Sequence, residues 1–488
     1  MTFGPIQIRD LLELLPYGIL SVSSLLLLLF ASMTGERGGA RKLYGALTFG
    51  AVVATLTSLL FVNGTSMPLR GLLIHDGLGF GFAAVVLLLL LFAVPVFHSG
   101  TARIRRAPAG TYSLLLLSAA GGLLMIFSNH LLVFFVGLEL LSLPLYVMTG
   151  LGATKDESSE AAFKYFLLGA VASAVLVYGM ALMWGTLGTL EISSMAQIFH
   201  ERGFTSGSLL MVGVTLFAAG ILFKIGLVPF HMWVPDVYQG APAPLVAWMS
   251  GAVKASVLCT ALRLFGRALP STSFNWVTAL SWLAMASMVW GSLAALYQTD
   301  VKRMLAYSSV AHAGYAAIAL TTSEGGSIEE AGAALVFYVL TYGLATFGAF
   351  LVVSLQEEEG KTKISDLSGL AKRRPGLALA LAICLLSLAG LPPLAGFVAK
   401  FNVFLLAAQQ GRYELVLVGV VTSVVSLAYY LRLIVAAYME DPAELTPIRR
   451  PFGAVAALGL ASAFTLLLGL LPGSVLDFLL RAGSQGVR

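Results

Sequence analysis

Seven ionisable side chains interrupt the long apolar segments of this 488-residue chain. They comprise one carboxylate, four lysines, one histidine and one arginine, at Glu139, Lys164, Lys224, Lys254, His312, Lys400 and Arg432. A charge at the centre of a bilayer costs roughly 2.5–3.5 kcal/mol, so several in one chain require partners or water. We therefore expect these side chains to face one another along the interior of the protein.

Lysine is a suitable residue for proton transfer in an apolar interior. Loss of hydration lowers the pKa of a buried ammonium, and a nearby carboxylate raises it. A lysine held between these two influences can gain or lose a proton when its neighbour changes charge. We predict a relay along the four lysines, with Glu139 as the partner of Lys164 or Lys224.

The remaining ionisable residues of the spans are predicted to have different roles. His312 can bridge Lys254 and Lys400, because imidazole both accepts and donates protons at moderate pH. Arg432 stays protonated, which favours a fixed charge or a structural anchor. His231 is a further candidate for the relay, and the alternative is that it satisfies backbone groups freed by the preceding proline.

Simpler explanations exist for several relay candidates. Lys164 follows Glu160 by four residues, which is also the spacing of an ion pair on a helix surface at the membrane boundary. Lys224 or Lys400 could extend along its helix and place the ammonium at the membrane surface. Glu139 is hardest to explain in this way, because its side chain is short.

Composition indicates that the bilayer surrounds most of this chain. Hydrophobic residues make up 58% of the sequence and charged residues 11%, whereas soluble domains carry roughly 25% charged residues. A spanning helix needs about 20 mostly apolar residues. Windows of that size predict an all-α polytopic membrane protein with about fourteen transmembrane helices, near 11–32, 44–63, 77–98, 112–128, 130–151, 161–185, 208–229, 241–265, 276–297, 304–322, 328–355, 376–407, 413–438 and 453–480. Residues 192–202 are predicted to form a short surface helix.

Prolines interrupt the seventh and twelfth predicted spans. The interruptions are Lys224–Pro229 and Gly390–Pro393, and broken backbone at membrane depth is tolerated where it is buried in protein or lines a wet cavity. The breaks lie five spans apart, which predicts two five-helix units, and a directly repeated unit with an odd number of spans must be inverted in the membrane. The predicted organisation is a three-helix segment over 1–111, repeats over 112–266 and 276–440, and a C-terminal helix within 441–488.

The loop charges predict the orientation of the chain. Sixteen Lys and Arg residues lie in loops after odd-numbered spans and four in loops after even-numbered spans. The positive-inside rule places the odd loops in the cytoplasm and both termini on the periplasmic side of a bacterial inner membrane.

Motifs for energy-supplying chemistry are missing from the sequence. It contains no GxxxxGK[ST] phosphate loop, no GxGxxG turn after a strand and no CxxCH haem motif. The two cysteines, Cys259 and Cys384, lie in apolar segments and form no metal-ligand pattern. We expect no cofactor or metal on this chain, no nucleic-acid partner, and a partner protein that supplies energy for proton movement.

Five longer stretches resemble the antiporter-like membrane subunits of respiratory complex I, the NADH-quinone oxidoreductase. These stretches cover residues 137–146, 160–169, 223–244, 299–309 and 388–397 in order, and the resemblance extends over about 112–440. Within the family the chain is most similar to subunit N, also called chain 2. Lysine at position 400 differs from the glutamate of subunit M, and the chain ends soon after its last span, unlike subunit L.

The resemblance implies a proton-translocating subunit whose redox chemistry occurs in its partners. It implies fourteen helices with inverted five-helix repeats and broken helices 7 and 12. Glu139, Lys164, Lys224, Lys254 and Lys400 match the family's ionisable positions. NADH, flavin, iron–sulfur clusters and quinone are expected in other membrane and peripheral subunits. Alternatives are a cation/proton antiporter subunit of an Mrp-type complex and a structural membrane scaffold with inert buried pairs.

Overall fold

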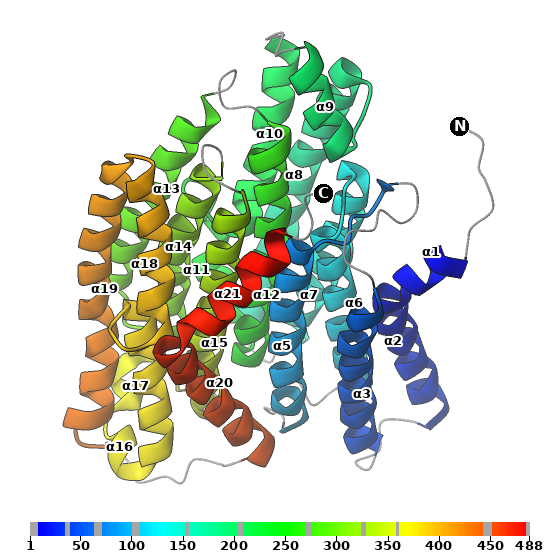
Figure 1. Cartoon of the computed structure of the whole chain (residues 1–488). Helices are drawn as coiled ribbons and strands as arrows, with labels where there is room; N and C mark the ends of the chain where they lie inside the picture. Colours follow the sequence, from blue (N-terminus) through cyan, green and yellow to red (C-terminus); the bar gives the residue numbers. More distant parts are fainter. Residues whose placement is uncertain are drawn as a thin grey trace.

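The computed structural model describes residues 8–34, 40–62, 71–99, 108–151, 156–202, 208–269, 275–323, 328–357, 361–442 and 451–484. These residues form a bundle of long helices that run side by side (Figure 1). The helices of the first half are α1 (Ile8–Glu13), α2 (Leu15–Thr34), α3 (Ala40–Phe61), α5 (Gly77–Ser99), α6 (Pro108–Ile126), α7 (Leu131–Gly150), α8 (Asp156–Leu187), α9 (Ile192–Arg202), α10 (Ser208–Ile225), α11 (Trp233–Gly240) and α12 (Ala243–Arg263).

The second half continues the bundle after a short π-helix that extends α12 over Leu264–Ala268. A 3-10 turn, Ile364–Leu367, lies between two helices of this half. The helices are α13 (Trp276–Leu296), α14 (Val301–Thr321), α15 (Ile328–Glu357), α16 (Leu370–Arg373), α17 (Pro375–Ala389), α18 (Ala395–Gln409), α19 (Tyr413–Met439), α20 (Phe452–Leu470) and α21 (Pro472–Ser484).

The predicted membrane spans correspond to helices of this bundle. Within the described ranges, twelve helices are long and apolar enough to cross a membrane. The two other predicted spans are α14, with 21 residues, and the pair α17 and α18, which are shorter apolar helices. The surface helix predicted at 192–202 is α9. The chain is therefore an all-helical polytopic membrane protein.

The last predicted span differs from the structure. We predicted one helix over 453–480, but α20 ends at Leu470 and α21 begins at Pro472 and crosses α5 and α15 obliquely (Figure 1). Proline has no backbone N–H, so it ends one helix and is tolerated at the first turn of the next. Helix α21 packs Val475, Leu476 and Leu479 against the core.

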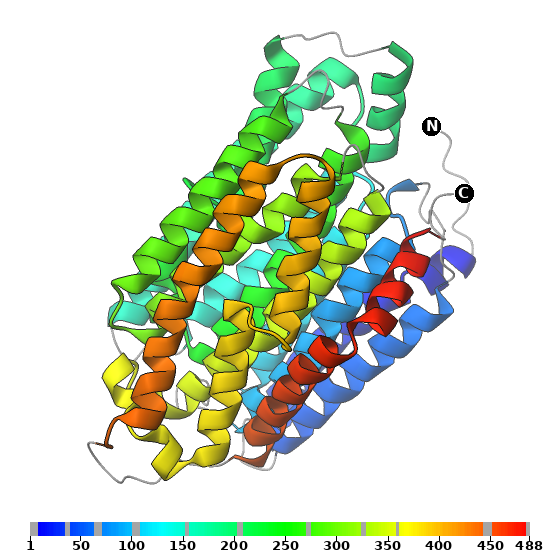
Figure 2. The same cartoon turned by 60° about the vertical axis from the view of Figure 1, so that its left-hand side comes forward.

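Three helices occupy the centre of the bundle. All 21 residues of α12 are buried, and most residues of α14 and α15 are buried too. In Figure 2 the yellow-green α14 and α15 lie behind the gold and orange α18 and α19. A polar side chain on α12 or α14 is therefore shielded from lipid by the protein itself.

The two breaks have the same local geometry. Gly226 and Gly390 adopt left-handed backbone with φ of 81° and 87°, which favours glycine because it has no Cβ. Their N–H groups donate to the carbonyl oxygens of Leu222 and Leu386, at 3.0 and 3.1 Å. A cis X-Pro bond begins two residues after each glycine, at Val228–Pro229 in one break and at Pro392–Pro393 in the other. The chain thus ends α10 and α17 alike and resumes as α11 and α18.

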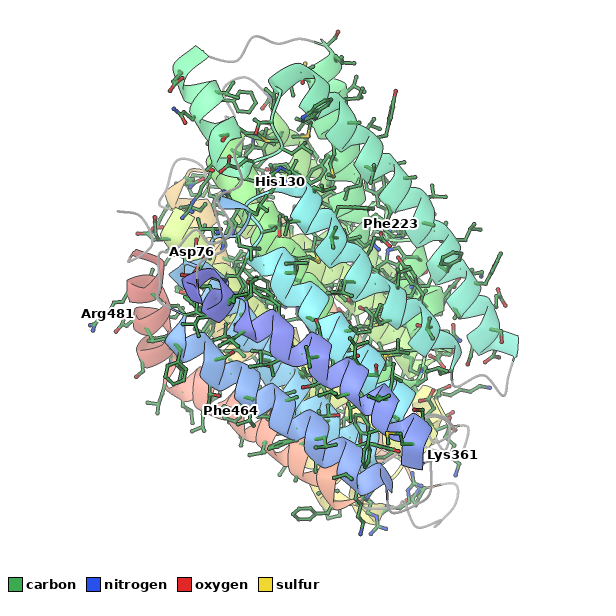
Figure 3. All side chains as sticks on the ribbon, turned by 90° about the vertical axis from the view of Figure 1, so that its right-hand side faces the viewer. Asp76, His130, Phe223, Lys361, Phe464 and Arg481 are labelled. Atoms are coloured by element: carbon green, nitrogen blue, oxygen red, sulfur yellow. The ribbon has the colours of Figure 1, made fainter. Side chains whose placement is uncertain are left out.

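The ends of the bundle are marked by labelled residues in Figure 3. Asp76 and His130 lie toward one end, Lys361 lies at the other, and Phe223 lies between them. Phe223 is the neighbour of Lys224, so the broken end of α10 lies inside the bundle and not at its rim.

Candidate functional site

Lys224 lies at the last turn of α10, where the helix breaks. Its side chain is buried and donates hydrogen bonds to Ser142 Oγ at 3.0 Å and Tyr146 Oη at 2.8 Å, both on α7. A Cβ at Gly169 would lie 2.1 Å from Tyr146 Oη, so glycine on α8 is what lets the tyrosine reach Lys224. The ammonium is therefore held by neutral hydroxyl groups.

Glu139 does not pair with a lysine in this structure. It lies on α7 one turn before Ser142, is half-buried, and accepts a hydrogen bond from Ser173 Oγ at 2.6 Å. Among the described residues, no lysine nitrogen lies within ion-pair distance of its carboxylate. The predicted pairing of Glu139 with Lys164 or Lys224 is therefore not seen as a direct contact among the described residues. Hydroxyl groups contact Glu139 and Lys224 in its place.

Lys164 is not buried, which corrects a second prediction. Its side chain is 40% exposed and pairs with Glu160 at 2.7 Å and with Asp236 at 2.8 Å. Arg303 at the start of α14 also pairs with Asp236, at 2.8 Å. Asp236 lies on α11, so these pairs fasten the second half of the broken helix to α8 and α14. The helix-surface explanation of Lys164 therefore describes one of its two contacts.

Lys254 lies at the middle of the fully buried α12. Its ammonium donates to the backbone oxygen of Ser309 and to Ser309 Oγ, the latter at 2.6 Å. Tyr342 donates to the same Ser309 Oγ at 2.9 Å, and the Lys254 nitrogen lies 4.9 Å from the centre of the Tyr342 ring. Like Lys224, this lysine is held by neutral oxygen atoms.

His312 lies between Lys254 and Lys400. Its Nδ1 is 2.7 Å from Tyr338 Oη, and its ring centre lies 4.9 Å from that of Tyr342. His312 also packs edge-on against Tyr315, at 5.6 Å, and the Lys400 nitrogen lies 4.6 Å from the centre of that tyrosine ring. Two tyrosines, Tyr342 and Tyr315, thus connect the histidine with the lysines on either side.

Lys400 lies next to the second break. It is buried on α18, and its Nζ donates to the carbonyl oxygen of Ala389 at 3.1 Å, the last residue of α17. A Cβ at Gly390 would lie 3.0 Å from Lys400 Cδ, so this glycine makes room for the lysine. Lys400 also lines a cleft of about 270 Å³ on the outer face of α18 and α19, with Phe397 and Phe401.

Two small cavities lie between the buried ionisable groups. One of about 10 Å³ is lined by Lys224, Lys254 and Tyr238, and another of about 10 Å³ by His312, Lys400 and other residues. A cavity of about 10–15 Å³ has room for one water molecule. A single water molecule in each could therefore connect side chains that do not touch directly.

Arg432 and His231 lie apart from this row. The Arg432 guanidinium donates to the carbonyl oxygens of Leu296 and Gln298 at the end of α13, where a positive charge is favourable. It is a structural anchor, which is one of the two roles predicted for it. His231 is half-buried beside Trp290, and its Nδ1 has no hydrogen-bond partner within the described part of the chain.

Two buried ion pairs were not predicted from the sequence. Lys302 Nζ lies 2.7 Å from Glu357 Oε1 with both side chains almost fully buried, although the sequence places Lys302 among the loop charges. Arg263 makes two bonds to Asp76, at 2.7 and 2.9 Å, and ties α12 to the start of α5. The residues of the first pair lie 55 positions apart in the sequence and those of the second pair 187. The only sign of either pair in the sequence was therefore a charged residue inside or beside an apolar segment.

His75 beside this second pair is also titratable. It accepts or donates a hydrogen bond with Tyr17 at 2.9 Å. Burial and the positive charge of Arg263 lower its pKa from 6.5 to about 4. His75 is therefore neutral at pH 7. Throughout the described ranges, no group of three or more His, Cys, Asp or Glu side chains could hold a metal ion.

Comparison with known proteins gives consistent matches. The family model described as NADH:quinone oxidoreductase/Mrp antiporter, TM, matches residues 128–426. The chain is 42% identical to NADH-quinone oxidoreductase subunit N of Rhodococcus opacus over 393 residues, which are 79% of this chain and 72% of the relative. It is 36% identical to subunit N of Trichlorobacter lovleyi over 475 residues, covering 97% of this chain and 96% of the relative.

Solved structures show the same fold. A chain of respiratory complex I from Thermus thermophilus with bound aureothin is 37% identical, with a TM-score of 0.80 and coverage of 95% of this chain and 98% of that one. A chain of the Mrp complex from Dietzia is 22% identical, with a TM-score of 0.80 and coverage of 98% of both chains, which shows a shared fold.

The fold and the site define a polytopic helical membrane protein with ionisable side chains along its interior and two broken helices beside them. The chain belongs to the NADH:quinone oxidoreductase/Mrp antiporter family of membrane subunits.

Proposed function

We propose that this chain is a proton-translocating membrane subunit of an NADH-quinone oxidoreductase, of the subunit N type. The observation that carries the proposal is the connected row of Lys224, Lys254, His312 and Lys400. It crosses the protein through its most buried helices, with short polar contacts or a water-sized cavity at each step. Inert buried charges would not need to form a connected row between the two helix breaks.

The contacts suggest how a proton moves along the row. The hydroxyl groups of Ser142, Tyr146 and Ser309 can each accept and donate, so they solvate a lysine in either protonation state. Tyr342 connects Lys254 with His312 through its hydrogen bond and its ring contact. Lys400 lies beside the second helix break at the end of the row, and from there it would pass the proton toward the far side of the membrane.

Glu139 and Lys164 are proposed to adjust the row without carrying the proton. Glu139 lies one turn from Ser142, so a change in its charge would act on Lys224 across a short distance. Lys164 pairs with Asp236 on α11 and thereby holds the second half of the broken helix. His231 is not assigned a step in this row.

The wider organisation is also a proposal. The matching geometry of the breaks supports two inverted repeats over 112–266 and 276–440, with the three-helix segment 1–111 before them and 441–488 after them. The distribution of Lys and Arg supports a bacterial inner-membrane location with both termini in the periplasm. NADH, flavin, iron–sulfur clusters and quinone are proposed to bind partner subunits.

The test uses the assembled complex in sealed vesicles. We expect Lys224→Ala and Lys400→Ala to lower the number of protons moved per quinone reduced, because each removes one proton carrier. Lys372→Ala is the matched control, since Lys372 is 59% exposed and lies outside the row. Full pumping per quinone in both Lys224→Ala and Lys400→Ala would contradict the relay.

Two rival functions predict other results. A cation/proton antiporter of the Mrp type is also named in the family description, and it requires sodium-dependent proton flux without electron input. A structural scaffold requires that neutral substitutions reduce assembly while each assembled complex pumps normally.

A further inference from the structure

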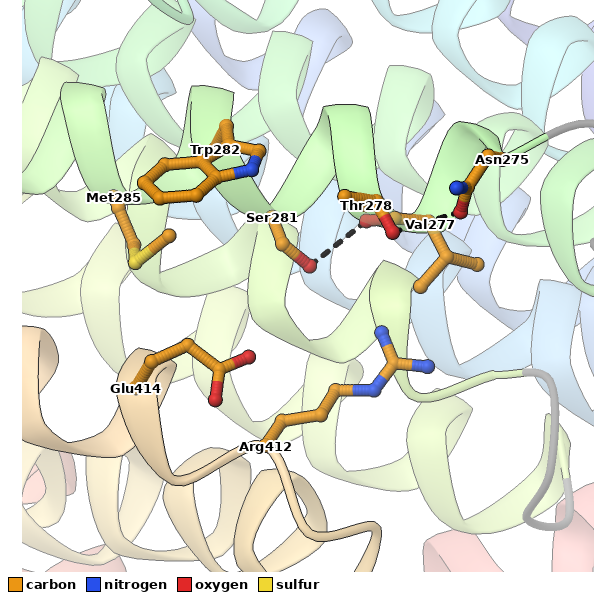
Figure 4. Close-up of a pocket in the computed structure, with 8 residues that line it drawn as sticks. All are labelled: Asn275, Val277, Thr278, Ser281, Trp282, Met285, Arg412 and Glu414. Carbon is orange, nitrogen blue, oxygen red and sulfur yellow. Dashed lines mark hydrogen bonds between the residues drawn. The ribbon is translucent and has the colours of Figure 1, made fainter.

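A cleft at the edge of the bundle lies apart from the proton row. It lies between the start of α13 and the start of α19 and encloses about 510 Å³. Figure 4 shows Arg412 and Glu414 extending from the start of α19 toward α13, with Asn275, Thr278 and Trp282 on the facing helix. A cation and an anion thus lie beside each other at one opening.

The cleft lies where two spans begin. Helix α13 starts at Trp276 and helix α19 at Tyr413, so both spans enter the apolar region from this level. Trp282 and Tyr413 are 66% and 68% exposed. Tryptophan and tyrosine are enriched where a spanning helix meets the lipid headgroups. The charged opening of the cleft is therefore at headgroup depth.

Below the opening, both helices present apolar side chains outward. On α13 the exposed residues include Trp290 and Leu293, and on α19 they include Leu417, Val421 and Val424. Met285 lines the inner part of the cleft. A molecule held at the opening would thus continue along apolar surfaces into the bilayer.

We propose that this cleft binds a phosphatidylethanolamine, with Arg412 on the phosphate and Glu414 on the primary ammonium. A guanidinium offers paired N–H donors that match phosphate oxygens, and a carboxylate accepts N–H bonds from an ammonium. The acyl chains lie along the exposed faces of α13 and α19. Thr278 and Asn275 add polar groups to the rim.

The charge pattern distinguishes this lipid from phosphatidylglycerol and phosphatidylcholine. Phosphatidylglycerol has a phosphate for Arg412 but no cation for Glu414. Phosphatidylcholine has a cation without an N–H group, so Glu414 would lose its hydrogen bonds. A charged hydrogen bond is typically the stronger kind, and its loss changes binding by roughly tenfold or more.

Photoactivatable lipids test the proposal on the purified whole complex. Phosphatidylethanolamine, phosphatidylcholine and phosphatidylglycerol that carry the same diazirine acyl chain are added separately, and labelled peptides are identified by mass spectrometry. We expect phosphatidylethanolamine to label peptides from 276–296 and 413–439 roughly tenfold more than the other two lipids. Equal labelling by all three lipids would overturn the proposal.

Single substitutions test the roles of Arg412 and Glu414 in lipid binding. Arg412→Gln and Glu414→Gln are each expected to lower phosphatidylethanolamine labelling by about tenfold. Lys372→Gln with Asp441→Asn removes an exposed ion pair elsewhere and should leave labelling unchanged. Unchanged labelling in both Arg412→Gln and Glu414→Gln would refute the assignment.

A competition experiment on the wild-type complex tests the proposal even where the variants do not assemble. Short-chain phosphatidylethanolamine, added before irradiation, should lower the labelling of the wild-type complex at a lower concentration than short-chain phosphatidylglycerol. Crosslinks from 276–296 to a partner subunit in place of lipid would show that a protein occupies the cleft, and would overturn the proposal.

Discussion

The buried pair Lys302–Glu357 allows a strong prediction about what holds the broken helix in place. Lys302 Nζ lies 2.7 Å from Glu357 Oε1 and 2.6 Å from the carbonyl oxygen of Ala241, and Ala243 N–H donates to Glu357 Oε2 at 2.9 Å. The pair therefore connects the turn between α11 and α12 with the start of α14 and the end of α15.

Removal of one partner should cost far more than removal of both. Lys302→Met leaves a buried carboxylate and Glu357→Gln leaves a buried ammonium, and breaking such a pair typically costs about 3–5 kcal/mol, or about 10²–10⁴-fold in the unfolding equilibrium. In the double variant no buried charge is left, and the amide introduced by Glu357→Gln still offers an acceptor for the Ala243 N–H. The stability of the double variant should return to within roughly 1–2 kcal/mol of the wild type.

The assay is the temperature at which half of this chain dissociates from the purified complex, followed on native gels. We expect both single variants to dissociate at clearly lower temperature than the double variant. Lys372→Met serves as control, because the Lys372–Asp441 pair is exposed and exposed ion pairs contribute little to stability. If the double variant dissociates at as low a temperature as the less stable single variant, an unpaired buried charge is not what destabilises the single variants.

Two further predictions concern other parts of the bundle. The pKa of His75 is lowered to about 4 by burial and by Arg263, while an unfolded histidine has about 6.5, so the unfolded state binds more protons between these pH values. The free energy of unfolding should therefore fall by up to roughly 3 kcal/mol as pH drops from about 6.5 to about 4. The measurement is hydrogen exchange of residues 71–80, which should become faster over this pH range after correction for intrinsic rates. His75→Gln should lack this pH dependence. For Gly396→Ala, a Cβ would lie 1.8 Å from the Ser387 carbonyl oxygen, so we expect the amount of assembled complex on native gels to fall. Gly376→Ala, with nothing within 4 Å of its Cβ, should assemble normally.

Much of the fold was predictable because membrane insertion depends on local composition. A span needs about 20 apolar residues whatever surrounds it, so windows of the sequence find the helices. The breaks were predictable for the same reason, since Gly390 and its following prolines alter the backbone locally. The end of α20 was missed although Pro472 was visible, because the apolar residues that follow it continue the hydropathy pattern of a span.

The partners of the ionisable residues depended on the tertiary structure. Sequence alone showed that Lys224, Lys254 and Lys400 lie in apolar segments and need polar neighbours. It suggested Glu139 for the first of them, whereas Ser142 and Tyr146 fill that role. Which face of a helix meets which neighbour is set by the packing of many apolar side chains, and no local pattern records that rotation.

The spans, their interruptions and the charges inside them follow from the amino-acid sequence, because each is a property of a short segment in a bilayer. The contact of Lys164 with Asp236 and the burial of Lys302 against Glu357 depend on how the helices pack together. Lys302 lies in the first turn of α14 and Lys164 in the third turn of α8, and burial at each position depends on whether another helix covers it. Helix α15 covers Lys302, while Lys164 stays 40% exposed.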